Sequence, residues 1–84
     1  MPDVNIVTRA TAGLLDRFEK DMRYDAHGTV IKVNRSDAGE ELRQRGQETI
    51  PLIKDRIQAL SAAAQTPVDE EVIACLKLLL SRVN

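Results

Sequence analysis

The chain has few aromatic residues, histidines or cysteines. Its 84 residues include no tryptophan, one phenylalanine, one tyrosine, one histidine and one cysteine. The single cysteine, Cys75, excludes a disulfide within the chain and is typical of a reducing compartment. Residues 1–5 contain an acid and lack the apolar run of a signal peptide. Both features predict a cytoplasmic protein.

Long apolar runs and an excess of one charge are also missing. Apolar runs span only a few residues, as in Leu78–Leu80, whereas roughly 20 are needed to cross a bilayer. The sequence therefore predicts no membrane anchor. The 12 basic and 13 acidic residues are mixed along the chain and give a formal net charge of −1. This balance argues against a nucleic-acid surface, which needs clustered positive charge.

What remains is the composition of an ordinary globular protein, with 43% hydrophobic and 30% charged residues. Because aromatic residues are scarce, the core must be built from Leu, Ile, Val and Ala, which favours packed helices over sheets. A chain of this length forms one domain with a modest core. The sequence predicts a single all-α domain over residues 1–84.

Four segments carry apolar residues at the 3.6-residue spacing of amphipathic helices. They predict a four-helix domain with helices over about 5–24, 37–45, 49–64 and 67–83. Residues 49–64 carry a second apolar stripe, so we expect them to form the central helix. The apolar stripe of the first helix consists of Val7, Ala10, Leu14, Leu15, Phe18 and Met22, and the core residues expected in the last helix are Leu76, Leu79, Leu80 and Val83.

Local signals mark the helix ends. We expect Gly28 to end the first helix in the left-handed conformation, and Gly46 to end the second. Thr66 followed by Pro67 is typical of a helix start. Gly13 lies inside the first helix, where the missing side chain would let another backbone approach.

Residues 29–34 interrupt the helical pattern. They are rich in β-branched residues and resemble a strand, but no second strand-like run exists to pair with them. We expect an extended connector whose Val30, Ile31 and Val33 fill the helical core, or an edge strand that pairs with a second copy of the chain.

Few residues offer catalytic or metal chemistry. His27 with Asp25 beside it could act as a general base, but a turn at a helix end is a normal place for a solvated histidine. His27 and Cys75 supply two ligands where a structural zinc needs four. We therefore expect no enzyme, cofactor or metal. An enzyme would require a pocket around His27, Tyr24 and Asp25.

One segment resembles a known family. Residues 38–60 resemble a single HEAT-like helical repeat, in which a short helix, a tight turn and a second helix opening with an apolar-Pro-x-apolar step build a binding surface. The resemblance covers about a quarter of the chain, and no second copy flanks it, although such repeats stack for stability. The residues that carry it are Ala38, Leu42, Gly46, Ile50, Pro51, Leu52, Ile53, Ile57 and Leu60.

These features together predict a non-enzymatic protein-interaction or scaffold module. The last helix has an apolar face of roughly 140°, broader than one core contact needs, and homodimerisation is the simplest way to cover the excess. The partner is thus expected to be a protein or a second copy of the chain. The interface candidates are Leu78, Val30, Ile31, Val33 and Tyr24.

The alternative is a small regulatory protein that binds nucleic acid through the outer face of the first helix. The basic residues there are Arg9, Arg17, Lys20 and Arg23, with Asp16, Glu19 and Asp21 between them. Such a protein would lose affinity steeply as salt rises.

Overall fold

The computed structural model describes the backbone of residues 2–83 and the side chains of residues 9–83. Over residues 2–83 the chain forms five α-helices and one 3-10 helix, with no strand. The elements are α1 (Pro2–Tyr24), α2 (Thr29–Arg35), α3 (Asp37–Arg45), η1 (Gly46–Thr49), α4 (Ile50–Ala63) and α5 (Pro67–Val83). The predicted all-α class is confirmed, and four of the helices match the predicted segments closely.

The fifth helix corrects one prediction. Residues 29–34 are not extended, because Thr29–Arg35 form α2 and Lys32 N donates to Gly28 O at 2.9 Å. A helix of seven residues is too short to be stable alone, so contacts with the rest of the chain must hold it. Val33 fills the core as expected, but Val30 and Ile31 are each 53% exposed and do not.

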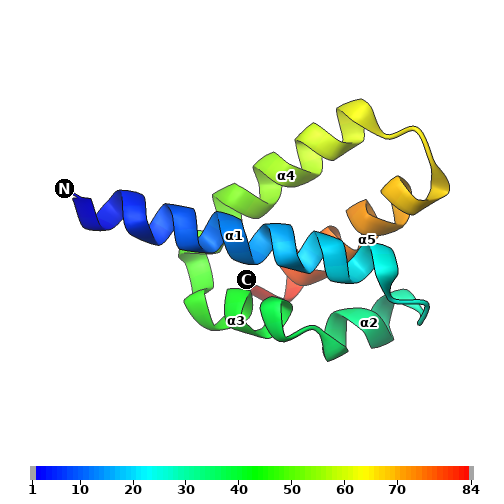
Figure 1. The fold of residues 1–84 in the computed structure, drawn as a ribbon, viewed down its shortest axis with the longest axis horizontal. Helices are drawn as coiled ribbons and strands as arrows, with labels where there is room; N and C mark the ends of the chain where they lie inside the picture. Colours follow the sequence, from blue (N-terminus) through cyan, green and yellow to red (C-terminus); the bar gives the residue numbers. More distant parts are fainter. Residues whose placement is uncertain (1, 84) are drawn as a thin grey trace.

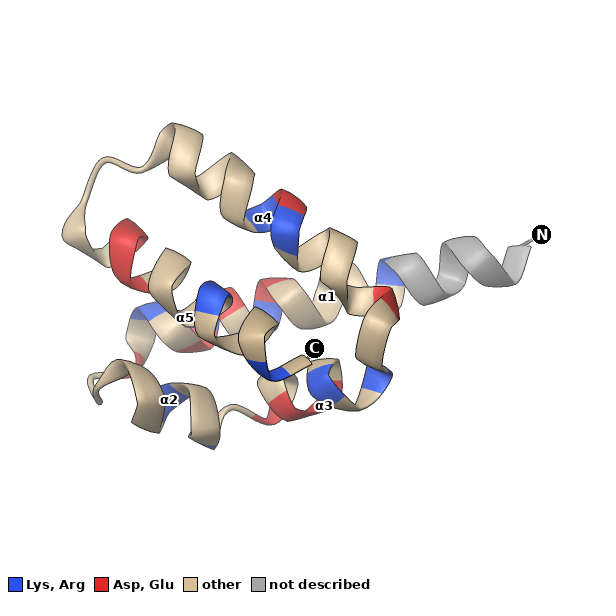
Figure 2. Ribbon diagram, turned by 180° about the vertical axis from the view of Figure 1, so that it is seen from behind, with Lys and Arg blue, Asp and Glu red and all other residues tan. Residues whose placement is uncertain are grey.

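The central helix is α5, which contacts α1, α2, α3, α4 and η1. α1 crosses α5, with α4 on one side of this pair and α2 and α3 on the other (Figures 1 and 2). The prediction that residues 49–64 form the central helix is wrong. The second apolar stripe of residues 49–64 ends in Ala59 and Ala63, which are exposed and too small to bury much apolar area.

One hydrophobic core joins the five helices. Phe18 and Leu42 are fully buried within it, and Leu76 and Leu79 are buried as predicted. Leu80 and Val83 pack half-buried against it, Ala10 is exposed, and the side chain of Val7 lies outside the described residues. The buried members are Leu14, Leu15, Phe18, Met22, Val33, Ala38, Leu42, Ile53, Val72, Cys75, Leu76 and Leu79.

Two glycines, Gly28 and Gly13, differ from their predicted roles, and Gly39 has a role that was not predicted. Gly46 has φ +71° and ends α3 as predicted, whereas Gly28 is extended at φ −63° and precedes α2. Nothing approaches Gly13, because a Cβ placed there would have no atom within 4 Å. The close approach is at Gly39, where a Cβ would lie 3.0 Å from Cε1 of Phe18. α3 therefore packs against α1 at a residue that the sequence pattern did not single out.

Candidate binding groove

A polar groove lies between the C-terminal half of α1 and the junction of α2 and α3. It encloses about 540 Å³, and a hollow of about 410 Å³ continues it along α1 and α3, sharing Arg17 and Asp37. We call the two together the polar groove. Its lining residues are Arg17, Lys20, Asp21, Tyr24, Asp25, Lys32, Arg35, Ser36 and Asp37, followed by Glu40, Glu41 and Gln44.

The α1 wall of the groove follows from helical spacing. Arg17, Lys20 and Tyr24 are three and four positions apart, so they share one face of α1, while Phe18 and Met22 point into the core. Tyr24 is 80% exposed. Within residues 9–83, the side chains of Arg17 and Lys20 form no hydrogen bond or ion pair. These two cations are thus available to a molecule outside the chain.

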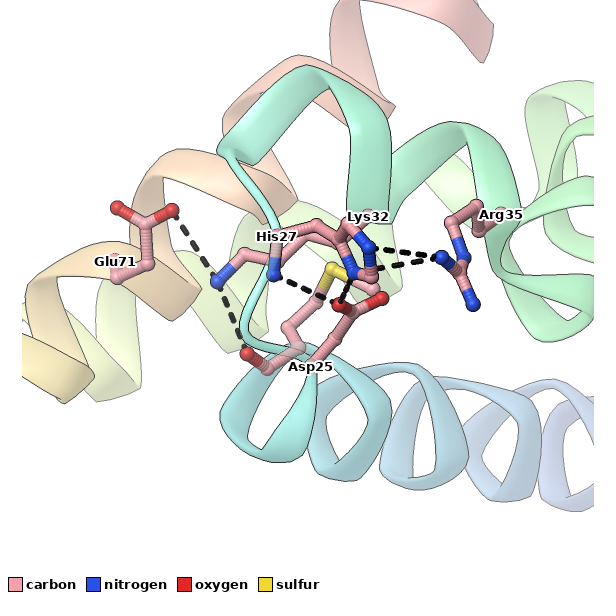
Figure 3. A network of polar contacts seen from close by, with 6 residues as sticks. Asp25, His27, Lys32, Arg35 and Glu71 are labelled. Atoms are coloured by element: carbon pink, nitrogen blue, oxygen red, sulfur yellow. Dashed lines mark hydrogen bonds and ion pairs between the residues drawn. The ribbon is translucent and has the colours of Figure 1, made fainter.

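Lys32 fixes α2 against the ends of α1 and α5. Its side chain is 5% exposed, and its Nζ donates to the carbonyl oxygen of Met22 at 3.1 Å and lies 3.2 Å from Oε1 of Glu71 (Figure 3). The Met22 carbonyl is in the last turn of α1, where carbonyls lack a partner within the helix. The Thr29 hydroxyl also donates to Glu71, at 2.5 Å. The Thr29 hydroxyl first, and Lys32 as well, hold the pKa of Glu71 below its ordinary value.

His27 connects the loop after α1 to Arg35 at the edge of the groove. Its backbone N–H donates to Oδ1 of Asp25 at 2.9 Å, and its Nδ1 lies 2.6 Å from the same oxygen. Nη1 of Arg35 lies 3.1 Å from Nε2 and 3.4 Å from Nδ1 of His27 (Figure 3). Because these two distances are similar, the guanidinium lies against the face of the imidazole ring and not in line with one ring nitrogen. His27 thereby connects Asp25 to Arg35.

The pocket that an enzyme would require is only partly formed. Tyr24 and Asp25 line the groove, but His27 is not among its lining residues. The imidazole instead holds Arg35 in place.

We predict that Asp25 makes the stability of the fold depend on pH. The backbone N–H of His27, and then its ring, lower the pKa of Asp25 in the folded chain. A carboxyl with a lowered folded pKa stabilises above its ordinary pKa, and this contribution is lost as the pH falls through the folded value. The gap in unfolding free energy between wild type and Asp25→Asn should therefore narrow between about pH 5 and 2. Urea unfolding measures it, with Asp55→Asn as the control, and a gap that widens in acid would refute the prediction.

Cys75 lies in the core behind α2. It is fully buried, and burial raises the pKa of its thiol to about 11. The thiol is therefore protonated at neutral pH and is neither a nucleophile nor a ready metal ligand.

We expect native Cys75 to resist thiol reagents. With a pKa of about 11, its thiolate fraction at pH 8 is about 100-fold below that of a free cysteine, even before burial blocks access. Reaction with an aromatic disulfide reagent should be slow in buffer and immediate in guanidinium chloride. A native rate equal to that of free cysteine would show that Cys75 is accessible.

The interface candidates predicted from the sequence fall into two groups. Tyr24, Val30 and Ile31 are exposed where the end of α1 meets the start of α2. Val33 is only 4% exposed, and Leu78 is half-buried against the core, so these two serve the fold of the chain itself. Within α2, Val33 packs into the core, whereas Val30 and Ile31, nearer the start of the helix, stay in contact with solvent.

Several residues of the groove were not found from the sequence. Lys32 and Arg35 share a face only if residues 29–35 are helical, and they were expected to be extended. Their spacing of three was the available signal. Asp37 lines the groove at the first position of α3, after Ser36, whose hydroxyl accepts from Gly39 N at 3.1 Å.

The basic residues that a nucleic-acid-binding surface on α1 would use lie in several different environments. Arg23 pairs with Asp69 at 2.9 Å, and Arg9 is exposed. Two of the acids between these basic residues bind another helix, because Arg56 of α4 lies 2.8 Å from Asp16 and 3.0 Å from Glu19. Figure 2 shows both signs of charge on the same helices. The described residues thus present cations interleaved with acids rather than one basic face.

Metal clusters and membrane-spanning helices are both absent from the described part of the chain. Within it, no three His, Cys, Asp or Glu side chains are placed to share a metal ion. No helix among the same residues is both long and apolar enough to span a bilayer. Comparison of the chain with protein-family models, with curated proteins and with solved structures gives no match.

Proposed function

We propose that the chain is a non-enzymatic protein-interaction module whose binding surface is the polar groove and the apolar residues at its end. The observation that carries this proposal is the exposure of Tyr24, which lines the groove, and of Val30 and Ile31 on the next helix, α2. Exposed aromatic and aliphatic side chains near a charged surface are the composition found at protein interfaces.

The way the surface is held supports the same proposal. Lys32 joins α2 to α1 and α5, and His27 holds Arg35 at the groove. A surface whose side chains are already fixed loses less conformational entropy when a partner binds. The hydrogen bonds that fix α2 are therefore useful to binding as well as to folding.

Further support comes from the chemistry of the candidate reactive groups. His27 contacts both Asp25 and Arg35, and the Cys75 thiol is buried and protonated, as suits a protein in the reducing cytoplasm. The HEAT-like resemblance of residues 38–60 stays a prediction, and it would make α3 and α4 part of a binding unit.

A photo-crosslinking amino acid at Ile31, compared with one at Gln58 on α4, tests the proposal in cells that make the chain. Both positions are exposed, so the comparison isolates the surface. We expect discrete protein adducts from Ile31 that are lost when Tyr24→Ser and Val30→Ser are added. No adducts from Ile31, the same adducts from Gln58, or adducts removed by nuclease would each contradict the proposal.

A further inference from the structure

The ring of His27 lies between an acid and a base at the edge of the polar groove. Its Nδ1 is 2.6 Å from Oδ1 of Asp25, and Nη1 of Arg35 is 3.1 Å from Nε2 and 3.4 Å from Nδ1 (Figure 3). The side chain of His27 is 48% exposed, so the ring exchanges protons with the solvent. The charge of this one ring therefore acts on two neighbours of opposite charge.

The position of Arg35 depends on the His27 ring. Arg35 is exposed, and within residues 9–83 the imidazole is the only group that contacts its guanidinium at hydrogen-bonding distance. Asp25, by contrast, also accepts a hydrogen bond from the backbone N–H of His27 at 2.9 Å. A change in the ring can thus free Arg35 while Asp25 stays in place.

Histidine is the side chain that changes charge between about pH 5 and 8. A guanidinium against the face of a neutral imidazole meets no like charge. Protonation of the ring places two positive charges 3.1 to 3.4 Å apart, and their repulsion in water favours separation by about five- to tenfold. The same proton strengthens the contact with Asp25, because the carboxylate then faces a cation.

We propose that protonation of His27 releases Arg35, so that the polar groove has a fixed cation at its edge when the ring is neutral and a mobile one when the ring is charged. The other two charged groups of this network, Lys32 and Glu71, lie 3.2 Å from each other and offset each other (Figure 3). The released guanidinium has other partners in the groove, because three acids line it. These acids are Asp21, Asp25 and Asp37.

The release of Arg35 regulates the surface to which the proposed function assigns a partner. A fixed side chain loses less conformational entropy on binding than a mobile one does. Binding that uses Arg35 should therefore weaken as His27 becomes protonated. This consequence rests on the proposed function, whereas the release itself is a property of the chain alone.

Nuclear Overhauser effects between the ring protons of His27 and the side-chain protons of Arg35 test the proposal at about pH 8 and about pH 5. We expect these effects to fall about twofold or more at the lower pH. His27→Phe keeps an aromatic ring but cannot be protonated, so its effects to Arg35 should be equal at the two pH values. The effect between the rings of the core and α3, from Phe18 to Gly39, is the control for the fold and should not change.

Effects of equal strength at the two pH values in the wild type would overturn the proposal, as would an equal fall in His27→Phe. The absence of effects to Arg35 in His27→Phe at both pH values would also overturn it, because the face of a ring would then not be what holds Arg35. So would a loss of the effect between Phe18 and Gly39, because the fold would then have changed. None of these outcomes alters the crosslinking test of the proposed function, since adducts from Ile31 form whether or not Arg35 is released.

Discussion

Replacing Lys32 with alanine is expected to lower the free energy of unfolding by about 3 kcal/mol. The substitution removes a buried side chain whose Nζ serves both the last turn of α1 and Glu71 of α5. The Met22 carbonyl then loses its hydrogen bond, and the space of the aliphatic stem is left empty. The loss is below that of a fully buried pair because the Glu71 side chain is 40% exposed and regains water.

Lys32→Met separates the two contributions. Methionine keeps most of the apolar stem and removes only the charge and the hydrogen bonds, so the loss should be about 1 to 2 kcal/mol. Denaturant unfolding followed by circular dichroism measures both variants. A Lys32→Ala chain as stable as the wild type would mean that α2 is not held through this side chain.

Gly39→Leu is expected to cost about 2 to 3 kcal/mol, the second large effect. A Cβ at this position would lie 3.0 Å from Cε1 and 3.2 Å from Cδ1 of Phe18. The Phe18 ring is fully buried and has no room to move aside, so α3 must shift away from α1. The strain therefore outweighs the gain in helix propensity from replacing glycine.

Gly13→Leu is the matched control for that prediction. It makes the same replacement inside α1, at an exposed position where a new Cβ would have no atom within 4 Å. Only helix propensity changes there, so the chain should become more stable by about 0.5 to 1 kcal/mol. If thermal or urea unfolding gave Gly39→Leu the same gain, the close packing of α3 on Phe18 would be disproved.

The sequence was sufficient to predict a helix and its ends where the helix has its own apolar stripe and end signals. α5 begins at Pro67 after Thr66, whose hydroxyl accepts from Asp69 N at 3.2 Å, and Gly46 ends α3 with a positive φ. These signals depend on neighbouring residues, so they can be read locally. The sequence was insufficient for α2, because its helical form depends on Met22 and Glu71, which are distant along the chain.

The difference between local signals and contacts distant along the chain also explains which residues of the candidate site could be predicted. Tyr24, Val30 and Ile31 were among the interface candidates, and the structure leaves all three exposed. Arg35 and the α3 wall of the groove were missed, since only the packing of α3 along α1 brings their charges beside Arg17. A groove between helices depends on how the helices are arranged, so it cannot be predicted from the apolar stripe of any one helix.

The arrangement of α1, α2 and α3 that builds the polar groove is tested most directly by NMR spectra of the wild-type chain. Residues 29–35 should have the chemical shifts of a helix, and the ring protons of Phe18 should show nuclear Overhauser effects to the Hα protons of Gly39. Extended-chain shifts over residues 29–35, or no such effect between Phe18 and Gly39, would contradict the account.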